Sequence, residues 1–104
     1  MTARVNLHAT AVATDAAGLL ILGRSGAGKS ALALSLIAFL RARGRFAALV
    51  ADDQVWLSVV NGRLVAEAPA AIAGLAEIRG YGPAPLDHEP RAVVDRVARL
   101  VVPP

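Results

Sequence analysis

The sequence predicts an α/β fold in which a mixed β-sheet carries a helix packed on one face. Two features predict it. An apolar run at 19–22 leads into a glycine-rich segment, and bulky residues at helical spacing follow from 29 to about 43. A second apolar run, 46–51, ends at the adjacent carboxylates Asp52 and Asp53. With 104 residues, 56% of them hydrophobic, the chain can form one small domain and is too short for two.

The N-terminal half is expected to contain a hairpin and then the helix. Residues 5–13 and 19–23 have strand composition and are joined by the turn-rich segment Asp-Ala-Ala-Gly at 15–18. The wholly apolar run at 19–22 is typical of a strand that is buried on both faces. The helix should end near Gly44, because glycine commonly follows the last turn of a helix.

The C-terminal half gives a clear signal in one place only. Residues 55–60 and 63–68 alternate loosely around an Asn-Gly pair, the strongest short-range hairpin signal in the chain. Residues 69–90 are rich in proline and glycine and are expected to be mostly irregular. The tail 91–102 fits either a helix or a strand, and the sequence leaves these alternatives open.

Composition argues against several classes of protein. The net charge is +3, but the arginines are scattered, with one cluster at Arg41, Arg43 and Arg45, and the four aromatic residues are not interleaved with them. A nucleic-acid-binding face would combine the two, so we expect none, and the cluster fits the negative end of a helix dipole. The chain lacks cysteine, a secretory signal and an apolar run of about 20 residues, so we expect no membrane span and a cytoplasmic location.

The pattern G-x-x-x-x-G-K-[ST] of a P-loop (Walker A) is met in full, between an apolar strand and a helix. Glycines let the backbone amides surround a phosphate, and the start of the following helix attracts the same anion. The lysine, the only one in the chain, would reach the terminal phosphates of ATP, and the serine hydroxyl would ligate Mg²⁺. The residues expected to bind the nucleotide are Gly23, Arg24, Ser25, Gly26, Ala27, Gly28, Lys29 and Ser30.

Three acidic residues are candidates for magnesium binding or for proton acceptance during phosphoryl transfer. Asp52 and Asp53 close a strand and project to different sides, so one can hold magnesium with Ser30 while the other accepts a proton. Glu77 is a further candidate on the magnesium side, with Arg79 as a phosphate-contacting cation, although the two could equally form an ordinary surface pair.

Four separated segments together resemble the catalytic domain of HPr kinase/phosphorylase. They are His8 on an expected strand, Gly-Arg-Ser-Gly-Ala-Gly-Lys-Ser at 23–30, Ala-Asp-Asp at 51–53 and Glu-Ile-Arg-Gly-Tyr-Gly at 77–82, in this order. Many ATPases share the loop, whereas the combination of the last two segments is much more specific. By itself, His8 would more simply be a structural residue. The resemblance runs from about residue 5 to residue 83.

The resemblance implies that residues 1–104 form a single P-loop kinase catalytic domain that uses ATP and Mg²⁺. Its relatives phosphorylate a serine of HPr, a small phosphocarrier of the sugar phosphotransferase system, and remove that phosphate with inorganic phosphate. They form hexamers, so an oligomer is expected here. Carried over by motif, the catalytic residues are Asp52 as the base, Lys29 on the β- and γ-phosphates and His8 assisting Asp52. The magnesium-side residues implied in the same way are Ser30, Asp53 and Glu77.

The sequence departs from the family pattern in three places. Ala9 stands where the family usually has glycine, and the segment 41–47 lengthens the helix region before the aspartates. The basic, proline-, glycine- and arginine-containing loop of the relatives falls beyond this sequence, so the expectation covers kinase activity and leaves phosphorylase activity open. The alternative is a nucleotide-sensing module with little catalysis that binds ATP and a partner such as a two-component signalling protein. Small-molecule phosphoryl transfer, as in the phosphoenolpyruvate carboxykinase family, is less favoured, because the sequence has no oxaloacetate-binding signature.

Overall fold

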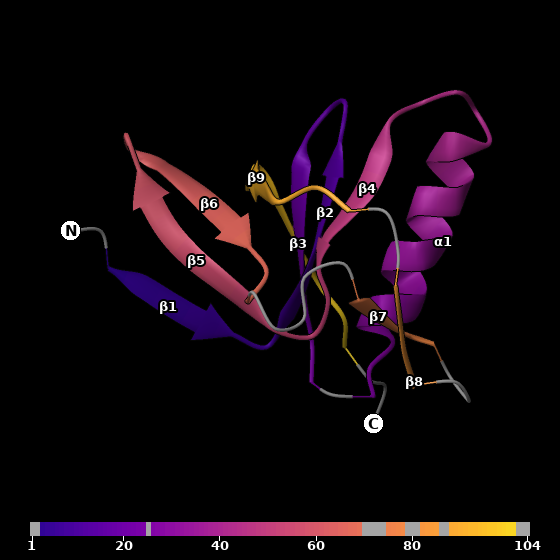
Figure 1. The fold of residues 1–104 in the computed structure, drawn as a ribbon, viewed down its shortest axis with the longest axis horizontal. Helices are drawn as coiled ribbons and strands as arrows, with labels where there is room; N and C mark the ends of the chain where they lie inside the picture. Colours follow the sequence, from indigo (N-terminus) through magenta and orange to yellow (C-terminus); the bar gives the residue numbers. More distant parts are fainter. Residues whose placement is uncertain (1–2, 25, 70–74, 79–81, 86–87, 102–104) are drawn as a thin grey trace.

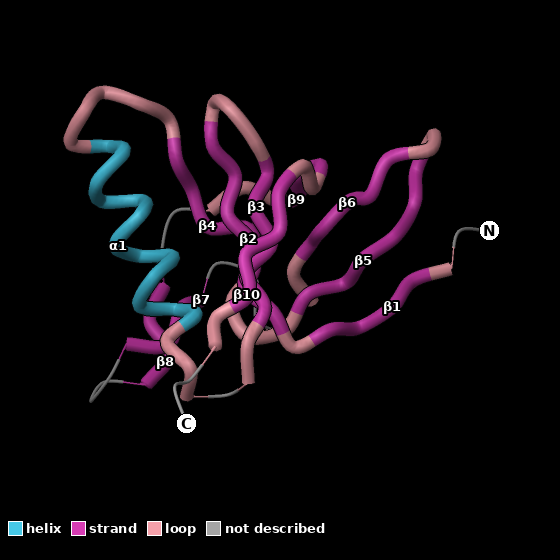
Figure 2. The backbone as a smooth tube through the Cα atoms, turned by 180° about the vertical axis from the view of Figure 1, so that it is seen from behind, coloured by secondary structure: helices cyan, strands magenta, loops and turns pink. Residues whose placement is uncertain are grey.

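The protein folds into three layers: an outer sheet, a central sheet and one helix on the far face of the central sheet (Figure 1). The structure is a computed structural model that describes all residues except 1–2, 25, 70–74, 79–81, 86–87 and 102–104. The view from behind shows the same order of layers, with the helix on one side and the outer sheet on the other (Figure 2).

Among the described residues, the outer and the central sheet have four strands each. The outer sheet is antiparallel throughout, in the order β1 (Arg4–Leu7), β5 (Val55–Val60), β6 (Arg63–Glu67) and β9 (Arg91–Val93). The central sheet has the order β10 (Arg96–Arg99), β3 (Gly18–Leu22), β2 (Ala9–Thr14) and β4 (Ala47–Ala51). Since β10 is parallel to β3 and the other pairs are antiparallel, the predicted mixed sheet is confirmed. Two further strands, β7 (Leu75–Ile78) and β8 (Gly82–Pro85), form a separate ribbon.

The helix α1 (Lys29–Arg41) packs on β4, β2 and β3, as the helical spacing predicted. Its inward face buries Ala33 and Ile37. At its start, Gly28 has a φ of 100°, in the left-handed region that glycine adopts without a steric cost. At its end, Gly44 has a φ of 72° and its N–H donates to the carbonyl of Arg41 at 3.0 Å, so the predicted glycine stop is confirmed.

Two apolar clusters hold the three layers together. Alternate residues of β2 divide between them, because successive side chains of a strand point to opposite faces. Ala9, Ala11 and Ala13 belong to the cluster between the two sheets, and Val12 belongs to the cluster between the central sheet and α1. Among the described residues, α1 is the one helix, and it lacks the length and the apolar character needed to cross a membrane.

The second cluster leads to a stability prediction. Leu49 is 2% exposed and packs under α1 with Ile21 and Ile37. We expect Leu49→Ala to lower the free energy of unfolding by about 2–5 kcal/mol, because it removes buried methyl groups and leaves a cavity. Urea unfolding followed by circular dichroism measures this. Leu32→Ala is the matched control, because Leu32 lies on α1 and is 39% exposed. An equal loss in the two variants would contradict the packing.

An exposed ion pair joins the β2–β3 turn to the segment after α1. Arg45 donates two hydrogen bonds to Asp15, at 2.8 and 3.2 Å, and these bonds together with its charge hold the pKa of Asp15 below the usual value. The pair therefore stabilises the fold above the unfolded-state pKa of Asp15, and this contribution is lost as the pH falls through the lower folded-state pKa. Because both side chains are exposed to solvent, the contribution is small.

Two segments differ from the prediction, and a third decides between two alternatives that the sequence left open. The expected strand 5–13 breaks at His8 into β1 and β2, which belong to different sheets. The stretch 69–90, expected to be mostly irregular, contains β7 and β8. In the tail 91–102 the strand alternative is confirmed, because two short strands, β9 and β10, join different sheets there. The Asn61-Gly62 hairpin is as predicted, with both residues at positive φ.

Candidate functional site

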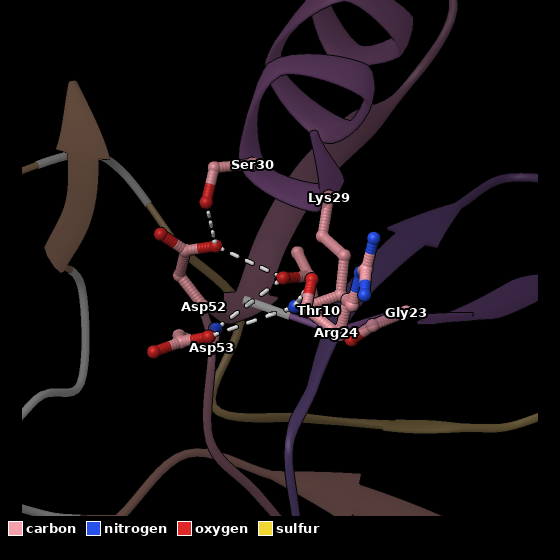
Figure 3. Close-up of polar contacts among 7 residues, drawn as sticks. All are labelled: Thr10, Gly23, Arg24, Lys29, Ser30, Asp52 and Asp53. Atoms are coloured by element: carbon pink, nitrogen blue, oxygen red, sulfur yellow. Dashed lines mark hydrogen bonds and ion pairs between the residues drawn. The ribbon is translucent and has the colours of Figure 1, made fainter. Parts of the chain in front are cut away.

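Four of the predicted site residues, Lys29, Ser30, Asp52 and Asp53, meet at one end of the central sheet. The strands β3 and β4 terminate at this end, and β2, which lies antiparallel between them, begins there. The glycine-rich loop leaves β3 toward α1, and Asp52 and Asp53 follow β4 directly. The topology therefore brings the loop and the two acids together across β2, although more than 20 residues of chain separate them (Figure 3).

Lys29 is the first residue of α1, and its side chain lies against the glycine-rich loop. It is 4% exposed. Its Nζ donates to the carbonyl oxygens of Gly23 at 2.8 Å and Arg24 at 3.2 Å. The same ammonium lies 3.7 Å from Oδ1 of Asp53 (Figure 3). A buried charge needs such partners, and here they hold the ammonium at the mouth of the loop.

Asp52 is buried behind Ser30. It is 5% exposed, and its Oδ1 accepts hydrogen bonds from Oγ of Ser30 at 2.6 Å and from Oγ1 of Thr10 at 3.0 Å. Because the proton of Ser30 points at Asp52, the lone pairs of the serine oxygen are directed elsewhere. The resemblance grouped Ser30 with Asp53, whereas the hydrogen bond of Ser30 goes to Asp52.

Asp53 has a different environment from its neighbour. Its side chain is 43% exposed and reaches toward Nζ of Lys29. Its φ is 66°, a left-handed conformation that a residue other than glycine adopts only when its surroundings hold it. The register of β2 against β4 also shifts between Ala11 and Val12, and such irregularities bend a strand and re-aim the residues that follow.

Sequence reasoning missed Thr10. Its side chain is fully buried, donates to Asp52 and accepts from the N–H of Asp53 at 3.3 Å, so it contacts both acids (Figure 3). The available signal was a polar residue within an expected strand, between the small apolar residues Ala9 and Ala11. Its partners lie more than 40 positions away in the sequence, so the pattern could not identify them.

The remaining predicted residues are less closely tied to this cluster. His8 is exposed and lines a cavity of about 660 Å³ together with Gly23, Arg24 and Arg99, and within the described part of the chain no hydrogen bond joins it to an aspartate. Glu77 lies on β7, a strand that packs against α1. Ser25 and Arg79 lie outside the described residues.

Ser30 and Asp52 have the chemistry of a magnesium site. Mg²⁺ prefers hydroxyl and carboxylate oxygens, and in sites with nucleotides it takes one or two protein ligands and completes its shell with phosphate and water. Among the described residues, no three His, Cys, Asp or Glu side chains come together as a metal site. A shared protein–nucleotide site is therefore the kind of site that these residues fit.

The chain is similar to proteins of one family. A family model described as "HPr Serine kinase C-terminal domain" matches residues 1–85. The HPr kinase/phosphorylase of Clostridium tetani is 42% identical over 76 residues, which cover 73% of this chain and 23% of that protein. The HPr kinase/phosphorylase of Caldicellulosiruptor bescii is 46% identical over 80 residues, which cover 76% of this chain and 24% of that protein.

The fold is also similar to a solved structure. The Hpr(Ser) kinase/phosphatase from Coxiella burnetii superposes with a TM-score of 0.80 at 30% sequence identity, covering 95% of this chain and 67% of that one. The chain spans about a quarter of the length of the curated relatives it matches. Since the family model covers most of the chain and the fold agrees, the chain belongs to the HPr serine kinase C-terminal domain family.

Proposed function

We propose that this chain binds Mg-ATP and transfers its γ-phosphate to a serine of HPr or of an HPr-like phosphocarrier. The observation that carries the proposal is the 2.6 Å hydrogen bond between Ser30 and Asp52 beside the buried Lys29. This bond joins the start of α1, directly after the glycine-rich loop, to the residue that follows β4. The group proposed to bind phosphate, Lys29, and the groups proposed to bind magnesium, Ser30 and Asp52, therefore lie next to one another.

The triphosphate would lie in the loop, which acts as a P-loop. The first turn of α1 has free backbone N–H groups, because the first four amides of a helix have no partner within it. Their partial positive charge attracts an anion. The ammonium of Lys29 would exchange its contacts with the carbonyls of Gly23 and Arg24 for the terminal phosphates.

The magnesium side would be formed by Ser30 and Asp52. The hydroxyl of Ser30 donates its hydrogen bond to Asp52, so the lone pairs of the serine oxygen are directed away from that acid. When bound, Mg²⁺ neutralises charge on the β- and γ-phosphates. Glu77 remains a predicted member of this side, carried by the resemblance.

We infer that Asp53 is the base, which exchanges the roles that the resemblance gave to the two aspartates. Asp53 is the more exposed acid, and it lies beside Lys29, which would hold the γ-phosphate. In the proposed step, the serine oxygen bonds to the γ-phosphorus while the bond from phosphorus to the β–γ bridging oxygen breaks. The serine proton passes to Asp53, and ADP leaves with the electron pair.

The acceptor comes from the names of the relatives, which are an HPr kinase/phosphorylase and an Hpr(Ser) kinase/phosphatase. Membership of their family favours transfer over the alternative of a sensor that only binds ATP. Assistance by His8, phosphate contact by Arg79, a hexameric assembly, a cytoplasmic location and a single catalytic domain over residues 1–104 stay predictions from the sequence.

The test has two stages with the same folded protein. Titration calorimetry is expected to show binding of Mg-ATP, and incubation with γ-labelled ATP and a purified HPr is expected to give phosphoserine on HPr. An HPr whose acceptor serine is replaced by alanine is the control for the site of labelling. Binding without transfer would support the sensor instead, and the absence of both would remove the proposal.

A further inference from the structure

The strongest unassigned feature of the site is the contact of one buried hydroxyl with both aspartates. Thr10, the second residue of β2, is 0% exposed. Its Oγ1 lies 3.0 Å from Oδ1 of Asp52 and 3.3 Å from the backbone N of Asp53. Nothing in the transfer chemistry proposed above uses this side chain, so its polar contacts need an explanation of their own.

The direction of the two hydrogen bonds is fixed by the groups present. A backbone N–H can only donate, so Thr10 accepts from Asp53. A hydroxyl has one proton, and an ionised carboxylate can only accept, so Thr10 donates to Asp52. Oδ1 of Asp52 thus accepts hydrogen bonds from both Thr10 and Ser30, which fixes the rotation of the carboxylate relative to Ser30.

The peptide of Asp53 is held by two consecutive residues of β2. The hydroxyl of Thr10 accepts a hydrogen bond from the N–H of Asp53, and the N–H of Ala9 donates to the carbonyl oxygen of Asp53 at 3.2 Å. These two hydrogen bonds are important because Asp53 has a φ of 66°, a conformation that persists only where the surrounding structure determines it. The conformation in turn directs the Asp53 carboxylate toward Lys29.

We infer that Thr10 is a positioning residue for phosphoryl transfer, which sets the distance and angle between the magnesium-side acid Asp52 and the base Asp53. The inference rests on the proposed function for its chemical meaning and on the contacts of Thr10 with Asp52 and Asp53 for its geometry. Thr10 itself would touch neither ATP nor the acceptor, because it lies behind the two aspartates and is fully buried. Its effect is on alignment, to which transfer is sensitive at the scale of 1 Å.

The test compares Thr10→Val with Thr10→Ser in the full chain. Valine keeps the shape of threonine and removes both hydrogen bonds, so we expect kcat for transfer to HPr to fall by about 10- to 100-fold. ATP affinity measured without magnesium should change by less than about twofold, because the loop and Lys29 are untouched. Serine keeps the hydroxyl and should restore kcat to within about threefold of the wild type.

The matched control is Thr14→Val at the other end of the same strand. The Thr14 hydroxyl donates to the carbonyl of Ala17 at 2.9 Å and accepts from the amides of Ala16 and Ala17, so the substitution also removes several hydrogen bonds from β2. Both valine variants are expected to unfold at lower urea concentration than the wild type. Only Thr10→Val should lower kcat.

Several results would overturn the inference. They are equal kcat values for the two valine variants, a loss of magnesium-free ATP affinity as large as the loss of kcat, or a failure of serine to restore activity. If the wild type itself transfers no phosphate, the proposed function fails, and a crystal structure of Thr10→Val still decides the positioning. Unmoved Asp52 and Asp53 in that crystal structure would contradict the inference, whereas a rotated Asp52 carboxylate or an altered Asp53 φ would support it.

Discussion

Replacing Lys29 by methionine is expected to weaken the binding of Mg-ATP by about 100-fold or more and to abolish transfer. The ammonium is the one buried cation beside the loop among the described residues. Two charge-assisted contacts to the β- and γ-phosphates, at about 1.5–3 kcal/mol each, give at least this factor. Titration calorimetry of the folded variant with Mg-ATP measures the affinity, and labelled ATP with HPr measures the transfer.

Methionine is the informative substitution because it is uncharged and close to lysine in length, so it can fill the same buried space. The carbonyls of Gly23 and Arg24 lose a donor, and a modest loss of stability is expected as a result. Arg41→Met is the matched control, since Arg41 ends the same helix and also donates to a backbone carbonyl, that of Ala47, at 2.7 Å. It should lower stability to a similar extent and leave ATP affinity unchanged.

A Lys29→Met protein that bound Mg-ATP within about threefold of the wild type would show that the loop is not a phosphate site. The comparison with Arg41→Met makes this conclusion independent of folding. If both variants lost ATP binding to the same degree, the loss would come from the fold, and urea unfolding would show it.

The sequence predicted the helix and the buried strand before the two acids well because each is a local pattern. A glycine-rich segment between an apolar strand and a helical repeat specifies its own geometry, and the strand before Asp52 is apolar because it is buried on both faces. The Asn61-Gly62 turn is local in the same sense.

The features that the sequence did not predict depend on contacts between distant segments. The break at His8 separates strands of two sheets, and no composition change marks it. The tail fits a helix or a strand until β3 and β6 provide edges for β10 and β9 to pair with. The partner of Ser30 depends on the conformation of the chain after β4, including the positive φ of Asp53, which residue types alone do not specify.

The second large effect is expected from Asp53→Asn, which should lower kcat for transfer to HPr by about 100- to 10,000-fold, the range for loss of a general base. An amide of the same shape cannot take the serine proton. Because Asp53 is 43% exposed and its charge would otherwise oppose the phosphates, the affinity for Mg-ATP should stay the same or rise slightly. Single-turnover kinetics at saturating ATP separate the chemical step from binding.

Asp52→Asn should behave differently, and the contrast decides which aspartate has which role. Asp52 is buried and bonded to Ser30, so its loss should reduce the gain in ATP affinity that magnesium provides and should also lower stability. Asp95→Asn is the control, because the Asp95 carboxylate is likewise a hydrogen-bond acceptor, in its case from the backbone amide of Gly18 at 3.0 Å, at the opposite end of β3. If instead Asp52→Asn lost only kcat while Asp53→Asn lost the magnesium effect, the original assignment from the family resemblance would be right. The hydrogen bond from Ser30 to Asp52 would then be a contact that the bound nucleotide rearranges.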